Sequence, residues 1–170
     1  GSTSTRNKRE ATKGKQSGRT VEIQRLIGRS LRTVVDLKKI KGSQLIIDCD
    51  VIQADGGTRT ASISGAFVAL SLAVKKLLKN KCLKQDPIKD YLSAISCGIL
   101  DKEILVDLDY NEDSKANVDA NFIFSKNLGI AEVQVSGEGS TFKADDLSKM
   151  IKMSEEAVKK IFQIQEKVLS

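Results

Sequence analysis

A turn with two adjacent glycines is the part of the chain whose residue types best suit chemistry. Gly56 and Gly57 form the turn, and Thr58 and Arg59 follow it directly. An apolar run precedes the turn and a long segment of small and apolar residues follows it, which predicts a strand, a turn and a helix. The free N–H groups at the start of such a helix, its dipole and the Arg59 guanidinium together suit a phosphate group. Thr58 can cap the helix or donate its hydroxyl to the anion.

The same turn has a purely structural interpretation, a capped helix with an arginine on the surface. Its glycine spacing matches neither the Walker loop nor the dinucleotide-binding pattern G-x-G-x-x-G, so neither nucleotide-binding fold is indicated. The turn alone leaves both interpretations open, because a pair of glycines has many uses.

A second cluster of side chains that suit chemistry is acidic. Asp107 and Asp109 alternate along a predicted strand, so we expect both on one solvent-facing side of it. Asp113 and Asp119 flank a short polar connection, and a turn there would bring their carboxylates together. The chain contains no histidine, and paired carboxylates suit a hard cation such as Mg²⁺ that is held partly by substrate phosphates. A charged surface loop is the alternative interpretation.

The predicted elements must position these side chains. In chain order they are a helix, a strand, a helix, four strands and a helix, at residues 20–35, 44–51, 60–78, 91–100, 103–110, 118–125, 130–137 and 143–169. Asp101 and Lys102 form a two-residue hairpin signal between the second and third strands. The predicted fold class is therefore α+β, with two layers and a mostly antiparallel sheet packed with helices.

The first predicted helix carries arginines with different expected roles. Thr20 is a plausible N-cap, and Arg19 just before it can point into a cleft. The face opposite the apolar stripe carries Arg25, Arg29 and Arg32. We expect these three side chains to be solvated or to lie at a subunit contact.

Charge divides the chain into an arm and a body. The formal net charge is +6, and residues 1–20 carry six basic residues against Glu10 alone. Residues 1–18 are predicted to be a basic, flexible arm whose first two residues remain from tag removal, and residues 19–170 one domain. A basic arm on a nearly neutral body suggests a polyanion, most often a nucleic acid. A solvated tail is the alternative.

The cysteines and the hydropathy exclude several classes of protein. Cys49, Cys82 and Cys97 contain no CxxC pair, and with no histidine the chain is a poor candidate for a zinc site or a histidine-based catalyst. No run approaches the roughly 20 apolar residues of a membrane span, and the polar, basic start of the sequence leads us to expect no secretory signal. We therefore expect a cytoplasmic, reduced protein with no membrane association.

Several motifs resemble ribonuclease PH, a family of bacterial phosphate-dependent exoribonucleases that trim the 3′ ends of transfer RNA. They are QSGRT at residues 16–20, EIQRLIGRSLR at 22–32, DCDV at 48–51, ADGGTRTA at 54–61, DLDY at 107–110 and EDS at 112–114. The resemblance runs from about residue 3 to the terminal helix. It implies a ribosomal-protein-type βαβα fold and a hexameric ring built as a trimer of dimers.

The resemblance also implies a reaction, in which inorganic phosphate attacks the 3′-terminal phosphodiester and releases a nucleoside diphosphate. Arg19 and the turn of Gly57, Thr58 and Arg59 would hold the phosphate. Because phosphate itself is the nucleophile, the protein needs only to position charges and compensate them.

Two further pairs of residues receive roles from the same motifs. Asp113 and Asp119 match the acidic pair that supports Mg²⁺ or acts as general acid. Arg6 and Arg9 fall in the loop associated with gripping transfer RNA.

The resemblance leaves two alternatives to an active enzyme. Members of the family carry roughly sixty additional residues before the point where this sequence starts, so we expect an N-terminally truncated chain that lacks the first strands of the fold. One alternative is a non-catalytic RNA-binding ring subunit, and the other is an inactive fragment of the enzyme. The presence of Arg19, Arg59, Asp113 and Asp119 together favours the enzyme.

Overall fold

The computed structural model describes residues 10, 14–40 and 42–170. Arg6 and Arg9, the predicted RNA-binding residues, lie outside the described residues. The elements are α1 (Gly18–Thr33), the 3₁₀ helix η2 (Leu37–Ile40), α2 (Thr58–Lys79), β1 (Leu92–Leu100), β2 (Glu103–Val106), α3 (Tyr110–Asp113), β3 (Val118–Ser125), β4 (Gly129–Gly137) and α4 (Ala144–Leu169). The predicted α+β class, with an antiparallel sheet packed with helices, is confirmed. The predicted two layers are wrong, because helices pack on both faces of the sheet and form two separate cores with it.

The four described strands form one antiparallel sheet in the order β2-β1-β3-β4. Asp101 and Lys102 connect β1 to β2, with φ angles of 50° and 71°. Positive φ at both central residues is what a two-residue hairpin requires, because that turn matches the right-handed twist of the strands. The predicted hairpin is therefore confirmed, and it fixes the register that pairs Leu100 with Glu103.

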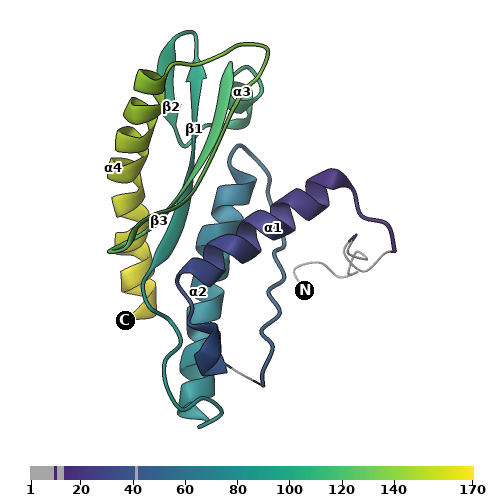
Figure 1. Ribbon diagram of the computed structural model, residues 1–170, viewed down its shortest axis with the longest axis vertical. Helices are drawn as coiled ribbons and strands as arrows, with labels where there is room; N and C mark the ends of the chain where they lie inside the picture. The colour runs from purple at the N-terminus through teal and green to yellow at the C-terminus, as the bar shows by residue number, and fades with distance from the viewer. Residues whose placement is uncertain (1–9, 11–13, 41) are drawn as a thin grey trace.

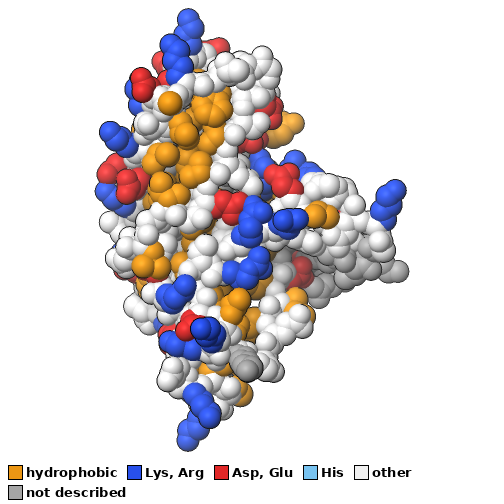
Figure 2. Space-filling view, viewed as in Figure 1, with side chains coloured by type: hydrophobic (Ala, Val, Ile, Leu, Met, Phe, Trp, Pro, Cys, Tyr) orange, Lys and Arg blue, Asp and Glu red, His pale blue; other side chains and the backbone are white. Residues whose placement is uncertain are grey.

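Helices cover both faces of the sheet, α4 on one and α2 with α1 on the other (Figure 1). Period-two alternation along β3 divides its side chains between two cores. Phe122 belongs to the core under α4, whereas Ile123 belongs to the core under α2 and α1. On the side of the sheet that faces α4, Ile130 and Val133 of β4 are exposed. Figure 2 shows hydrophobic side chains gathered over the upper part of the molecule in that view.

Among the described helices, α2 alone is long and apolar enough to cross a membrane by length and composition, which the sequence analysis did not expect. Its apolar side chains have an explanation within the fold. Ile63, Phe67, Leu70 and Val74 are buried and belong to the core between the sheet and α1. A buried core helix can match a membrane-spanning helix in length and apolar composition.

The predicted strand at residues 44–51 is wrong. The segment is extended and its side chains alternate, with Leu45, Ile47 and Cys49 packed against the core while Ile46 is 83% exposed. However, its backbone joins no strand ladder within the described part of the chain. The segment runs back along α2 towards the start of that helix (Figure 1). Alternation predicts an extended backbone, but a strand also needs a neighbour, and sequence patterns do not supply one.

Two details of α1 also differ from the predictions. The N-cap is Ser17 rather than Thr20, and its hydroxyl accepts a hydrogen bond from the Thr20 N–H at 3.2 Å. Arg29 was expected to be solvated or at a subunit contact, but its guanidinium forms an ion pair with Glu132 of β4. That pair joins α1 to the edge strand of the sheet.

Cys49, Cys82 and Cys97 are thiols that form no disulfide bond in the described structure. Cys97 is fully buried in β1, and burial raises the pKa of its thiol to about 11. A thiol with so high a pKa is a poor nucleophile at neutral pH. Cys97 therefore acts as a small apolar side chain of the core.

Candidate functional site

The two predicted residues Arg59 and Asp119 are in direct contact. Arg59 is the second residue of α2 and Asp119 the second residue of β3, and the Arg59 Nη2 and Asp119 Oδ2 atoms are 2.8 Å apart. The Arg59 Nη1 atom also lies 3.4 Å from Oε1 of Glu22 on α1. About a fifth of each side chain in the Arg59–Asp119 pair is exposed (23% and 22%), so solvent reaches both side chains. The site therefore joins three elements: α1, α2 and β3.

The start of α2 offers backbone N–H groups beside this pair. Gly57 is the N-cap, in the left-handed conformation with φ 66°, and it supplies no side-chain cap in the described structure. The idea that Thr58 caps the helix is wrong, because Thr58 is already the first helical residue. Thr60 donates its hydroxyl to the Gly57 carbonyl at 2.8 Å and so stabilises the turn. A helix start without a side-chain cap, beside an arginine, suits an anion.

Asp113 lies close enough to Arg59 and Asp119 for their charges to shift the pKa of its carboxyl. Burial of its carboxyl raises the pKa of Asp113 above the ordinary value of 3.8, and the negative charge of Asp119 raises it further. The positive charges of Arg59 and Arg19 oppose this rise, and the charge of Glu138 adds to it. The structure thus brings together Arg19, Arg59, Asp113 and Asp119, which the sequence analysis had grouped from four separate segments.

The other two aspartates of the acidic cluster have structural positions. They were predicted to share one face of a strand, and this is wrong because β2 ends at Val106. Asp107 follows it with φ 63°, so the chain turns sharply at that residue. Asp109 is the N-cap of α3 and forms a capping box with Glu112, in which each side chain accepts a hydrogen bond from the other residue's N–H at 2.9 Å.

Sequence reasoning missed Asp55 and Ser96, which connect the glycine turn to the acidic segment 107–113. The Asp55 carboxylate accepts a hydrogen bond from the N–H of Tyr110 at 2.6 Å. The Ser96 hydroxyl accepts one from the N–H of Leu108 at 3.2 Å. Only the position of Asp55 directly before the glycines was visible in the sequence, and that position does not reveal its distant partner.

The carboxylates present suit a magnesium ion only as part of its coordination shell. Within the described residues, no group of three or more His, Cys, Asp or Glu side chains is arranged to hold a metal. Asp113 and Asp119 form a pair, and their mutual repulsion is what a cation would relieve. Mg²⁺ commonly takes one or two carboxylates and completes its shell with water and phosphate oxygens. The pair fits such an ion when a phosphate substrate is present.

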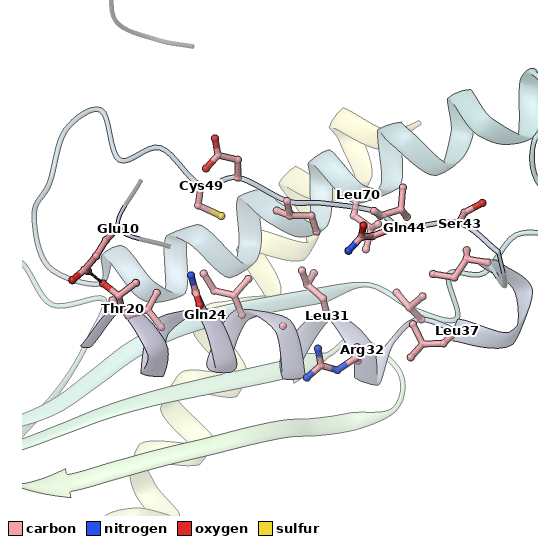
Figure 3. A pocket seen from close by; sticks show the side chains of 18 residues that line it. Glu10, Thr20, Gln24, Leu31, Arg32, Leu37, Ser43, Gln44, Cys49 and Leu70 are labelled. Atoms are coloured by element: carbon pink, nitrogen blue, oxygen red, sulfur yellow. Dashed lines mark hydrogen bonds between the residues drawn. The ribbon is translucent and has the colours of Figure 1, made fainter. Parts of the chain in front are cut away.

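A separate groove of about 730 Å³ lies between α1 and the extended segment that follows it (Figure 3). Leu31, Leu37, Cys49 and Leu70 are among the side chains that line it. None of the predicted site residues Arg19, Arg59, Asp113 and Asp119 is among them. The groove is therefore distinct from the candidate site.

Comparison with known proteins gives two matches to one family. Residues 2–76 match the model described as the 3′ exoribonuclease family, domain 1, and residues 90–157 match domain 2 of the same family. Together the two matches cover most of the chain.

Solved structures share the fold at low sequence identity. Rice (Oryza sativa) Rrp46 superimposes with a TM-score of 0.68 at 18% identity, over 92% of this chain and 68% of its own. The Archaeoglobus fulgidus exosome with RNA bound to the active site gives a TM-score of 0.65 at 19% identity, over 89% of this chain and 63% of its own. An archaeal exosome core gives 0.63 at 19% identity, over 89% and 64%. This chain thus spans about two thirds of the length of each of these structures.

Proposed function

Because the chain belongs to the 3′ exoribonuclease family, we propose that it is the catalytic part of a phosphate-dependent 3′→5′ exoribonuclease of the ribonuclease PH type. Its substrate is the 3′ end of transfer RNA, and inorganic phosphate is the co-substrate. The observation that carries this proposal is the contact of Arg59 with Asp119 at the uncapped start of α2, beside Asp113.

The start of α2 binds the phosphate in this proposal. The N–H groups that follow Gly57 point along the helix axis, and the dipole favours an anion there. Thr58 stands at the first helical position, where its N–H and hydroxyl are both near the anion. Arg59 provides a bidentate fork, and Arg19 on α1 adds a second positive charge near Asp113. An incoming phosphate competes with Glu22 and Asp119 for Arg59.

The chemical step needs no protein nucleophile. An oxygen of the bound phosphate attacks the phosphorus of the terminal phosphodiester, and the bond from that phosphorus to the 3′ oxygen of the preceding nucleotide breaks. The terminal nucleotide leaves as a nucleoside diphosphate, and the shortened RNA keeps a free 3′ hydroxyl once its oxygen gains a proton. Asp113 is the proton donor in this proposal, because burial and Asp119 favour its protonated form.

Mg²⁺ bound by Asp113 or Asp119 and by phosphate oxygens would neutralise the charge that develops on the transferred group. Arg59 and the start of α2 compensate the remaining charge, and their fixed positions remove the need for reorganisation during the step. If the ion is bound by Asp119, Asp113 remains free to donate the proton. If the ion is bound by Asp113, that carboxyl serves as a ligand instead.

The remaining parts of the proposal concern assembly and the RNA. Family resemblance supports a cytoplasmic hexameric ring, a trimer of dimers. Arg6 and Arg9 of the basic arm would grip transfer RNA. Since such contacts displace counterions from phosphates, affinity for RNA should fall steeply as salt rises.

The decisive experiment measures products from a short RNA with a labelled 3′ nucleotide. We expect nucleoside diphosphate release that requires both inorganic phosphate and Mg²⁺ and that stops on chelation with EDTA. Light scattering on the same sample gives the oligomeric mass, expected near six subunits. Release of nucleoside monophosphate without phosphate would indicate hydrolysis and would contradict the proposal.

A second candidate is a non-catalytic RNA-binding ring subunit. The observation that favours it is the pairing of Arg59 with both Glu22 and Asp119. These two carboxylates already neutralise the positive charge of Arg59 that would otherwise bind a phosphate. The two candidates differ in phosphate binding, which calorimetry measures without any RNA. RNA binding without phosphate binding or product release would favour the non-catalytic subunit.

A further inference from the structure

Asp55 is the residue through which the glycine turn contacts the acidic segment 107–113. Its Oδ1 atom accepts hydrogen bonds from the N–H of Tyr110 at 2.6 Å and from the N–H of Gly56 at 2.9 Å. Tyr110 is the first residue of α3, and Asp113 is the last residue of that single turn. One carboxylate oxygen thus joins the start of α2, which carries Arg59, to the start of α3, which carries Asp113.

The two segments are also in direct backbone contact. A Cβ atom added to Gly56 would lie 2.0 Å from the carbonyl oxygen of Leu108 and 2.8 Å from the carbonyl carbon of Asp109. No side chain fits at position 56 while the segments keep this distance. Glycine at this position is therefore required by the approach of segment 107–113.

Ser96 of β1 holds the other side of the same segment. Its carbonyl accepts a hydrogen bond from the Asp107 N–H at 2.8 Å, and its hydroxyl accepts one from the Leu108 N–H. Ser96 is buried, and its hydroxyl would be 3.0 Å from a Cβ atom added to Gly57. The acidic segment therefore lies between a fixed strand and the start of α2, and Asp55 supplies the side-chain bond on the α2 side.

From these contacts we propose that Asp55 is a positioning residue that sets the distance between the phosphate-binding start of α2 and the Asp113 carboxyl. The inference rests on the proposed function for its catalytic consequence, but the contact itself does not. Arg59 is oriented by Asp119 and Glu22, and the helix fixes its own N–H groups. Loss of the Asp55 carboxylate therefore affects the placement of Asp113 and leaves phosphate binding almost intact.

The test compares Asp55→Ala with Asp55→Asn, which keeps an acceptor oxygen. The matched control is Asp36→Ala, because the Asp36 carboxylate also accepts a backbone hydrogen bond, from Lys38 at 3.0 Å, but at the far end of α1. Amide hydrogen exchange at Tyr110 reports the contact without any catalysis. We expect exchange there to accelerate about tenfold in Asp55→Ala, since a bond to a charged acceptor is lost, and to stay unchanged in Asp36→Ala.

Kinetics on the same assembled protein separate positioning from phosphate binding. In Asp55→Ala we expect kcat to fall by roughly 10- to 100-fold, because small displacements of a catalytic group have effects of this size. The KM for phosphate should stay within about twofold of the wild-type value, because the groups that bind the phosphate keep their positions. Asp55→Asn should recover most of kcat. Unchanged exchange at Tyr110, a raised KM with normal kcat, or failure of the asparagine to restore kcat would each overturn the proposal.

A wild-type protein without nucleoside diphosphate release would contradict the proposed function and still leave the positioning role open to measurement. Mn²⁺ then serves as the probe, because its binding near Asp113 broadens nearby resonances in a magnetic resonance spectrum. Weaker Mn²⁺ binding in Asp55→Ala than in Asp36→Ala, together with faster exchange at Tyr110, would support the positioning role. Equal binding in the two variants would overturn it.

Discussion

Arg59 on α2 and Asp119 on β3 form an ion pair with 2.8 Å between Nη2 and Oδ2, although 60 residues separate them in the chain. The pair is partly exposed, so its own contribution to stability is small, on the order of 1 kcal/mol or less. Its importance lies in geometry, because it places a guanidinium at the start of α2 beside a carboxylate of β3.

Removal of the guanidinium should therefore affect catalysis more than stability. We expect Arg59→Ala to lower phosphorolysis by at least about 100-fold, the size of effect seen when one preorganised charge partner is lost. RNA binding should change little, because the proposed RNA contacts lie in the basic arm. Steady-state release of nucleoside diphosphate and a filter-binding assay measure the two effects.

Arg29→Ala is the matched control for that variant, since Arg29 is also a helix arginine paired with an acidic residue of the sheet. It should retain turnover near the wild-type level. Equal turnover in Arg59→Ala and Arg29→Ala would remove Arg59 from the phosphate site.

Asp113 should make stability depend on pH with a definite sign. Burial and the charge of Asp119 raise its pKa above 3.8, so at intermediate pH the folded protein holds a proton that the unfolded chain has lost. The free energy of unfolding therefore falls as pH rises through this interval. Asp113→Asn lacks the titration, and we expect it to gain stability relative to wild type at pH 7 but not below pH 3.8. Urea unfolding in EDTA measures the difference.

The same variant tests the proposed proton donor, because an asparagine side chain cannot deliver the proton. Loss of turnover together with the stability gain would agree with the proposal. Wild-type turnover in Asp113→Asn would assign Asp113 to a structural role only.

Local signals in the sequence predicted much of the fold. The hairpin at Asp101 and Lys102 depends on two adjacent residues, and α4 depends on spacing within one segment, so both were predictable from short windows. Residues 44–51 failed because a strand requires a neighbour that no local pattern identifies. The extended backbone was predicted correctly, but its pairing was not.

The candidate site shows the same division between local and distant information. Its residue types were visible in the motifs around Arg59 and Asp113, and the structure brings these residues near one another, whereas their roles stay predictions. The contacts of Asp55 with Tyr110 and of Arg29 with Glu132 span 55 and 103 residues. Such pairs depend on the register of the sheet and the packing of the helices, and one sequence carries no direct signal for them.

Asp90 should give stability the opposite pH dependence from Asp113. Burial opposes its charged form, but hydrogen bonds from Ser125 and from the backbone and side chain of Asn127 prevail and lower the pKa of Asp90. The stabilisation is therefore present above the ordinary pKa of 3.8 and is lost as pH falls through the lowered value. We expect Asp90→Ala to cost about 2–3 kcal/mol at neutral pH, because donors near the β3–β4 turn lose a charged acceptor.

Asp86→Ala is the control for Asp90. The Asp86 carboxylate is exposed, and within the described residues it accepts one local hydrogen bond, from the N–H of Ile88. Its cost should be well under that of Asp90→Ala. Urea unfolding at pH 7 and pH 2.5 measures both, and the cost of Asp90→Ala should shrink at the lower pH. A cost independent of pH would mean that the carboxylate charge contributes nothing.

Gln165 of α4 should be a stability determinant that links three elements. Its side-chain Nε2 donates to the carbonyl of Ser64 on α2 at 3.1 Å and to the carbonyl of Leu92 on β1 at 3.0 Å, and the residue is almost fully buried. Gln165→Met keeps the length of the side chain but removes both donors. We expect it to lower the free energy of unfolding by about 1–3 kcal/mol, since the Leu92 carbonyl loses a partner in a buried position.

Gln163→Met is the matched control, because Gln163 lies on the same helix with an exposed side chain. Its effect should stay within about 0.5 kcal/mol, as for most surface substitutions. Urea unfolding of the two variants at one pH gives the comparison directly. Among the described residues the Gln165 Oε1 atom has no hydrogen-bond partner. The methionine therefore also removes a buried polar atom that lacks compensation, and this gain offsets part of the loss. Equal stability of the two variants would mean that the offset is complete and that Gln165 fixes the approach of α4 without stabilising the fold.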